Sequence, residues 1–252
     1  MNEIMDKLPK ITIFFWIMKI CATTLGETAG DLLSMTLNVG YAVSTIILLG
    51  IFLVTLITQL FSKKYHPFLY WSVILSTSTA GTTMSDFMDR TLGLGYATGT
   101  MILITLLVSI LAIWRFTQGS ISVENIKTLK IELFYWTAIL FSNTLGTALG
   151  DYLADDSGLG FAGGAALIGA ILAVIVLLHY YTNISKVVLF WAAFVLTRPF
   201  GATLGDFLTK PIEKGGINLG TIGSSLILGA ILLIFIIYTT GKVNREANLI
   251  NA

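Results

Sequence analysis

The sequence predicts an all-α integral membrane protein with eight transmembrane helices, formed by four parallel two-helix repeats with pseudo-symmetry about the membrane normal. Three observations support this fold class. Of the 252 residues, 55% are hydrophobic and 12% are charged, against roughly 25% charged in a soluble domain. Eight apolar stretches have the roughly 20 residues needed to cross a bilayer. One pattern of tryptophan, glycine and aspartate recurs four times.

The apolar stretches follow one another closely, so we expect a single transmembrane domain over residues 1–252. The expected spans are approximately 11–35, 41–62, 67–90, 96–117, 131–153, 160–181, 186–208 and 219–240. The net charge of +1 does not favour nucleic acid as a partner. Cys21 is the only cysteine, which excludes intrachain disulfides and a thiolate zinc site.

Each repeat has a glycine ten residues after its tryptophan and an aspartate five residues after that glycine. The sets are Trp16, Gly26, Asp31; Trp71, Gly81, Asp86; Trp136, Gly146, Asp151; and Trp191, Gly201, Asp206. A recurring period of this length indicates copies of one supersecondary unit. We place the repeats at approximately 10–63, 65–118, 130–183 and 185–240. The tryptophans are typical of an interfacial belt, and their fixed phase predicts packing between repeats as well.

Basic residues predict the orientation. Ten lysines and arginines flank the spans on one side, whereas the opposite loops hold only Arg90, Lys210 and Lys214. By the positive-inside rule, both termini of a multi-pass protein of the cell membrane are then cytoplasmic. The first helix of each repeat runs outward with its aspartate near the outer end. The second helices have almost no polar side chains, so we expect them to face lipid.

Residues four apart share one face of a helix, and the face that ends at each aspartate is polar. If these four faces turn toward one axis, they form four layers. From the outside inward the layers are Asp31, Asp86, Asp151, Asp206; Glu27, Thr82, Thr147, Ala202; Thr23, Ser78, Asn143, Arg198; and Lys19, Ile74, Ile139, Phe194.

The acids of the first two layers are the candidate metal ligands. Acids within a membrane are costly and mark functional sites by default, and four clustered carboxylates need a cation or shared protons. Carboxylate, hydroxyl and amide oxygens suit hard cations such as Mn²⁺, Mg²⁺ and Ca²⁺. We therefore expect Asp31, Asp86, Asp151, Asp206 and Glu27 to bind a divalent cation, with neutral oxygens from Thr23, Thr82, Asn143 and Thr147. The alternative is that each aspartate merely ends a helix at the headgroup level.

Lys19 and Arg198 are the only bases well inside the expected spans. Pairing of Arg198 with Glu27 is the favoured interpretation, since it lowers the cost of burying both charges. These bases could also neutralise the acids of an empty site, gate the inner half, or bind an anion. The glycine spacing, for example Gly26 with Gly30, allows close helix packing; a helix unwound at glycine is the alternative.

Several segments resemble a known family. They are Phe15-Trp16, Thr24-Leu25-Gly26 and Gly30-Asp31 in the first repeat, and Tyr135-Trp136, Thr144-Leu145-Gly146 and Gly150-Asp151 in the third. Through them the chain resembles bacterial integral-membrane proteins of four tandem repeats, each with two transmembrane segments and a characteristic tryptophan, named as a repeat of unknown function. Ser85-Asp86 and Arg198-Pro199 depart from the pattern. The resemblance implies the eight-helix architecture and no activity.

From the residues we expect a transporter of a cation, most simply a divalent metal, with the lipid bilayer as surroundings. The cation would be substrate rather than cofactor, and oligomerisation stays open. One alternative is transport of a small organic anion or solute held by Lys19 and Arg198. Another is a membrane scaffold or partner subunit that transports nothing. No span combines a nucleophile, a base and an orienting acid, so we do not expect an enzyme.

Overall fold

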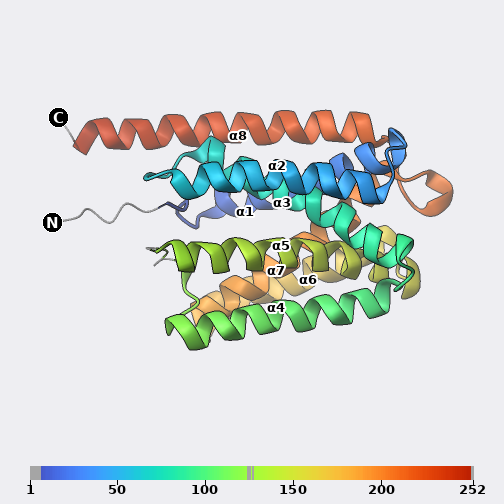
Figure 1. The fold of residues 1–252 in the computed structure, drawn as a ribbon, viewed down its shortest axis with the longest axis horizontal. Coiled ribbons are helices and arrows are strands. Elements are labelled where there is room, and N and C mark those ends of the chain that lie inside the picture. Colours follow the sequence, from blue (N-terminus) through green and yellow to red (C-terminus); the bar gives the residue numbers. More distant parts are fainter. Residues whose placement is uncertain (1–6, 124–125, 127, 251–252) are drawn as a thin grey trace.

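The computed structural model describes residues 7–123, 126 and 128–250, with side chains as far as residue 241. In this part the chain forms eight α-helices and no strand (Figure 1), as predicted. The helices are α1 (Ile13–Asp31), α2 (Tyr41–Phe61), α3 (Pro67–Asp86), α4 (Tyr96–Gln118), α5 (Leu129–Asp151), α6 (Gly160–Tyr181), α7 (Lys186–Thr209) and α8 (Thr221–Ile250).

A short π-helical turn follows the aspartate in each of the first three repeats: η1 (Leu32–Thr36), η2 (Phe87–Thr91) and η4 (Tyr152–Asp156). In the fourth repeat α7 continues to Thr209 and the short 3₁₀ helix η5 (Ile212–Lys214) follows. Single π turns inside helices are frequent at functional sites. Here the three turns lie directly beyond the first layer.

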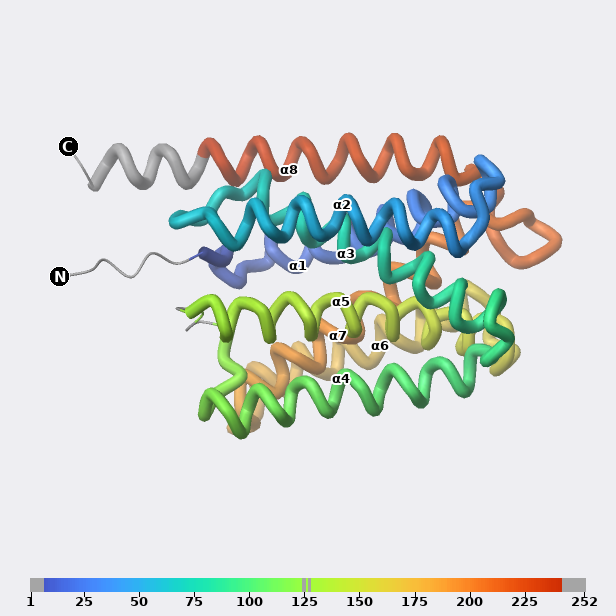
Figure 2. The backbone as a smooth tube through the Cα atoms, in the orientation of Figure 1, coloured from blue at the N-terminus to red at the C-terminus, as the bar shows by residue number. Residues whose placement is uncertain are grey.

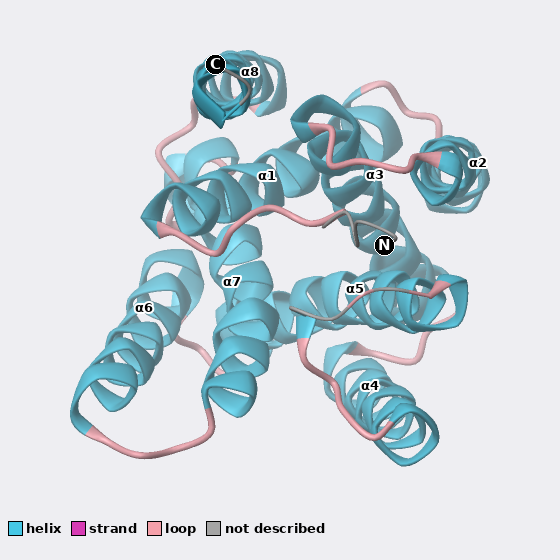
Figure 3. Ribbon diagram, turned by 90° about the vertical axis from the view of Figure 1, so that its left-hand side faces the viewer, coloured by secondary structure: helices cyan, strands magenta, loops and turns pink. Residues whose placement is uncertain are grey.

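The first helices of the repeats form a closed central ring, seen end-on in Figure 3. In this ring α1 and α5 each pack against both α3 and α7. The peripheral helices α2, α4 and α6 pack against the central helix of the next repeat, and α8 returns to α1. Thus each repeat covers its successor, and the fourth closes the ring on the first. The tube in Figure 2 traces the chain from α1 to α8. The end-on view in Figure 3 shows α8 next to α1, although the two helices are far apart in the sequence.

Five helices are long and apolar enough to span a membrane, in the part of the chain described: α2, α4, α6, α7 and Thr221–Gly241 of α8. Their exposed side chains are largely aliphatic, including Ile46, Val54, Met101 and Leu226. The remaining central helices, α1, α3 and α5, carry the polar stripe predicted from the sequence. Their hydroxyls and acids lower the mean hydropathy, although the side chains concerned are buried against neighbouring helices.

Glycine allows the central helices to approach closely. A Cβ atom added at Gly81 would lie 2.9 Å from backbone atoms of Asn143 and Thr144, and one at Gly201 would lie 2.8 Å from the Thr23 Cβ. The packing interpretation of the small-residue spacing is therefore confirmed at these contacts, since no side chain fits between the helices. The helices α1, α3, α5 and α7 also continue through their recurring glycines without unwinding.

Three of the recurring tryptophans are core residues. Trp71, Trp136 and Trp191 are at most 4% exposed. Their ring centroids lie 5.8, 5.6 and 6.4 Å from those of Phe15, Tyr70 and Tyr135, respectively, each in the preceding repeat. The predicted packing of the tryptophans between repeats is therefore confirmed. These three tryptophans are buried within the protein, whereas an interfacial belt would expose them at its surface.

Candidate functional site

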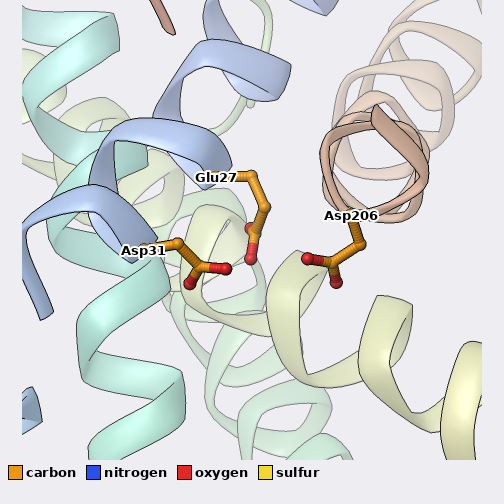
Figure 4. Close-up of side chains that lie close together, drawn as sticks. All are labelled: Glu27, Asp31 and Asp206. Carbon is orange, nitrogen blue, oxygen red and sulfur yellow. The ribbon is translucent and has the colours of Figure 1, made fainter. Parts of the chain in front are cut away.

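The acid-bearing faces of the central helices meet around one axis. The four aspartates of the first layer are 2–3% exposed although each carries a carboxyl group. Carboxylate oxygens of Glu27, Asp31 and Asp206 lie within 4.8 Å of one another. Figure 4 shows these three side chains pointing toward one another from α1 and α7. The structure thus brings together acids that are far apart in the sequence.

Two bases join the four aspartates into two pairs. The Lys210 Nζ atom lies 2.7 Å from the Asp31 Oδ2 and 3.0 Å from the Asp206 Oδ1. On the other side of the axis, the Arg90 Nε lies 3.0 Å from the Asp86 Oδ1, and its Nη2 lies 3.2 Å from the Asp151 Oδ2. Each base therefore links the aspartate of its own repeat to that of the next, with repeat four linked to repeat one.

Arg90 and Lys210 belong to the expected outer loops and have no part in the site predicted from the sequence. Both lie four residues beyond an aspartate, so they continue the polar stripe by one more turn. The equivalent residues in repeats one and three are Met35 and Asp155. Extending the layers by this one step would have identified the two bases. Of the two bases expected to neutralise the acids, Arg198 pairs with Glu27, whereas Arg90 and Lys210 pair with the aspartates.

Arg90 is fixed from several directions. Gly40 and Gly95 precede α2 and α4 with φ angles of 80° and 74°, a conformation that glycine adopts without strain. These turns place Tyr41 and Tyr96 beside Arg90. The Nη1 atom of Arg90 donates to the Tyr41 hydroxyl at 3.0 Å, and the guanidinium lies 5.8 and 5.6 Å from the centroids of the Tyr41 and Tyr96 rings. Cation–π attraction acts at such distances.

Lys210 is held differently. In the described part of the chain its ammonium group contacts the carboxylates of Asp31 and Asp206 alone, and its side chain is 19% exposed. Burial lowers the pKa of Lys210, but the Asp206 and Asp31 carboxylates outweigh that effect and hold the pKa above its ordinary value. Lys210 is therefore protonated at neutral pH. A lysine is a flexible point charge, whereas a stacked, bidentate arginine is geometrically constrained.

The second layer is organised by Arg198, which is fully buried. Its Nη1 and Nη2 atoms each lie 3.0 Å from the Glu27 Oε2, which confirms the predicted pair. Nη2 also donates to the hydroxyls of Thr82 at 2.6 Å and Thr147 at 2.7 Å. All hydrogen bonds to the Glu27 carboxylate within the described part of the chain go to Oε2. Its other oxygen, Oε1, remains available for a further ligand.

Apart from Arg198, the described residues of the third and fourth layers form no hydrogen bond or ion pair with the acids. The Thr23 hydroxyl donates to backbone oxygens, including that of Thr197 at 3.1 Å. The Asn143 amide donates to the Thr77 hydroxyl at 2.9 Å and accepts from the Lys19 Nζ at 3.4 Å. Among the described residues neither Thr23 nor Asn143 contacts a carboxylate. Of the four expected neutral ligands, only Thr82 and Thr147 lie beside an acid.

Lys19 occupies the boundary between the polar layers and an apolar floor. It is fully buried, and its ammonium lies 4.2 Å from the centroid of the Phe194 ring. The expected contact of Lys19 with an acid is not made within the described chain. Its position does agree with the predicted fourth layer, because it meets Phe194 of the same layer and Asn143 of the layer above.

Chemically, Glu27, Asp31 and Asp206 form the arrangement best suited to a hard cation. Three carboxylate oxygens within 4.8 Å need small adjustments to reach the ~2.3–2.6 Å bond lengths of Ca²⁺ sites. The Lys210 ammonium already occupies the position of a positive charge between two of them. The other pair, Asp86 and Asp151, has Arg90 fixed between its members.

The closed ring of central helices and the buried column of paired charges define a repeat-built helical bundle with a polar axis. The family model described as Repeat of Unknown Function (DUF347) matches residues 14–65, 69–120, 134–185 and 189–242. The chain therefore belongs to this family, and the four matches confirm the four tandem repeats. Comparison with curated proteins and with solved structures gave no match.

Proposed function

We propose that this protein transports a cation, most simply a divalent metal ion, across the cell membrane, with Glu27, Asp31 and Asp206 as its binding site. The observation that carries the proposal is the convergence of these three buried carboxylates within 4.8 Å. Carboxylates inside a membrane are costly to bury and mark ion pathways there. The repeats then surround a pathway along the membrane normal with pseudo-symmetry, all eight helices cross the bilayer, and both termini are cytoplasmic.

In this mechanism Lys210 is the counter-ion of the empty site. A divalent cation that reaches Asp31 and Asp206 displaces the Lys210 ammonium, which is 19% exposed and can turn toward water. Glu27 then contributes its free oxygen while Arg198, Thr82 and Thr147 hold the other. Arg90 cannot leave its pair as readily because Tyr41 also binds it. The substrate site is thus on the side of repeats one and four.

The alternatives differ in which contacts they require. Anion transport by Arg198 is disfavoured because its Nη atoms already bind Glu27 and two threonines. A membrane scaffold has one specific observation in its favour, namely that every acid of the first two layers touches a base. In a scaffold these pairs are permanent, whereas in a transporter the Lys210 pair exchanges with the substrate.

Metal-dependent thermal unfolding of the detergent-purified protein separates these two functions. We expect one of Mn²⁺, Mg²⁺ or Ca²⁺ to raise the melting temperature, since a ligand at a hundred times its Kd adds about 2.7 kcal/mol of stability. Asp31→Asn should abolish the rise. Lys210→Gln should tighten metal binding by about tenfold, or about 1.4 kcal/mol, because the competing ammonium is gone.

Arg90→Gln is the matched control, since it removes the base from the other aspartate pair. We expect it to lower the melting temperature without metal but to leave the metal-dependent rise intact. If no cation stabilises the protein, and Lys210→Gln binds none either, the pairs are permanent and the scaffold function replaces the transporter.

A further inference from the structure

We infer that a ring of four aromatic residues, strapped by residues 7–11, is the inner gate of the pathway. This inference rests on the proposed transport function. One turn beyond the fourth layer, the stripe reaches Phe15, Tyr70, Tyr135 and Phe190, the residues directly before the recurring tryptophans. The structure places these four around a single cavity of about 280 Å³.

The aromatic ring closes the axis through contacts that run from repeat to repeat. The Tyr70 and Tyr135 hydroxyls are 2.7 Å apart and share a hydrogen bond, and the Phe15 and Phe190 rings lie 6.5 Å apart between centroids. Phe190 also lies 5.8 Å from Trp16, which links repeat four to repeat one. With Tyr70 and Tyr135 at most 1% exposed, the ring separates Lys19 and the polar layers from the cavity.

Residues 7–11 cover the cavity from the other side, and all five line it. Figure 3 shows this segment crossing in front of the central helices at the end of the bundle that holds the chain termini. It crosses without forming a helix. The cavity therefore lies between two closures, the aromatic ring and the strap.

An ion pair formed by Lys7 helps to fasten the strap. The Lys7 Nζ atom lies 2.8 Å from the Glu132 Oε2 on α5 and donates to the Leu60 backbone oxygen on α2 at 3.2 Å. Glu132 is 2% exposed, and its Oε1 is buried with no hydrogen-bond partner in the described chain. The Lys7 side chain, in contrast, is 21% exposed. Water can therefore reach one partner, so this pair opens more readily than the fully buried pair of Arg198 and Glu27.

In the closed state the aromatic ring stops any cation at Lys19. Release of Lys7 loosens the strap, opens the cavity to water, and leaves room for the four rings to move apart. A binding site at the aspartate end and a closure at the opposite end are the two parts that alternating access requires. The aromatic residue directly before each recurring tryptophan takes no part in the acid site, and in this proposal it forms the gate.

Thiol labelling of purified protein tests the gate. In a Cys21→Ser background, Phe190→Cys reports on the cavity and Ile139→Cys reports on the fully buried layer beyond the ring. Lys7→Gln should raise the rate of labelling by a charged maleimide about tenfold at both positions, a change equal to about 1.4 kcal/mol in the opening equilibrium. Lys63→Gln, an equal charge change at an exposed position, should leave both rates unchanged.

Faster labelling at position 190 alone would overturn the gate. It would mean that release of the strap exposes the cavity while the aromatic ring beyond it stays closed. Unchanged labelling at both positions would overturn it as well. If Ile139→Cys does not fold, Phe194→Cys on α7 reports on the same layer. The metal-dependent rise in melting temperature, measured on Lys7→Gln, should persist, so failure of the gate and failure of the cation site give different results.

Discussion

Replacement of Arg198 by alanine is expected to lower the free energy of unfolding by about 3–5 kcal/mol, the cost of leaving a buried charge without its partner. Arg198 is fully buried and holds Glu27, Thr82 and Thr147 together. Without Arg198, the hydroxyls of Thr82 and Thr147 are the remaining hydrogen-bond donors to the Glu27 carboxylate among the described residues. Thermal or denaturant unfolding of the detergent-purified protein measures this loss.

The double variant Arg198→Leu with Glu27→Gln separates the stranded charge from the lost packing. It should be clearly more stable than Arg198→Ala, because replacing both members of a buried pair is often neutral. The same double variant should lose metal-dependent stabilisation, since a carboxylate of the proposed site is gone. If Arg198→Ala unfolds at the temperature of the parent, the pair does not support the bundle as described.

Gly81→Ala is expected to destabilise the ring of central helices by about 1–3 kcal/mol, the usual range for an overpacked interior. The added methyl group would lie 2.9 Å from backbone atoms of Asn143 and Thr144 on α5. A backbone cannot move aside as a flexible side chain can, so α3 and α5 must separate. The effect is measured by thermal unfolding in detergent.

Gly50→Ala provides the control because nothing lies within 4 Å of the added methyl group. Gly50 is exposed on the peripheral helix α2, where alanine favours the helix by up to about 1 kcal/mol. This variant should be as stable as the parent or more so. Equal losses for the two substitutions would mean that close approach of α3 and α5 is not what the recurring glycine provides.

The helices and the acid column could be predicted because both follow from helix periodicity. Residues four positions apart lie on one face of a helix, so the polar stripe of each repeat is predicted to share a face. The four aspartates occupy equivalent positions in the repeats, so they are predicted to lie at the same height in the bundle. Arg198 and Glu27 were paired for the same reason, since their layers adjoin. Each of these inferences needs only the geometry of one helix and the assumption of equivalent repeats.

The partners of the aspartates depend on features beyond that periodicity. Arg90 lies in the π turn η2, and Lys210 follows the last turn of α7. Hydropathy assigned both residues to loops. The packing of each peripheral helix on the following repeat also has no sequence signal, because an apolar helix fits either neighbour. The strap of residues 7–11 is held by an ion pair between Lys7 and Glu132, which lie 125 positions apart in the sequence.

Uptake of Mn²⁺, Mg²⁺ or Ca²⁺ by proteoliposomes tests the central claim most directly, with the parent protein compared to Asp31→Asn and Asp151→Asn. Both aspartates belong to the first layer and both are buried. The proposed site predicts that Asp31→Asn abolishes uptake while Asp151→Asn, which lies in the Arg90 pair, retains it. Uptake by Asp31→Asn at the rate of the parent would contradict the account.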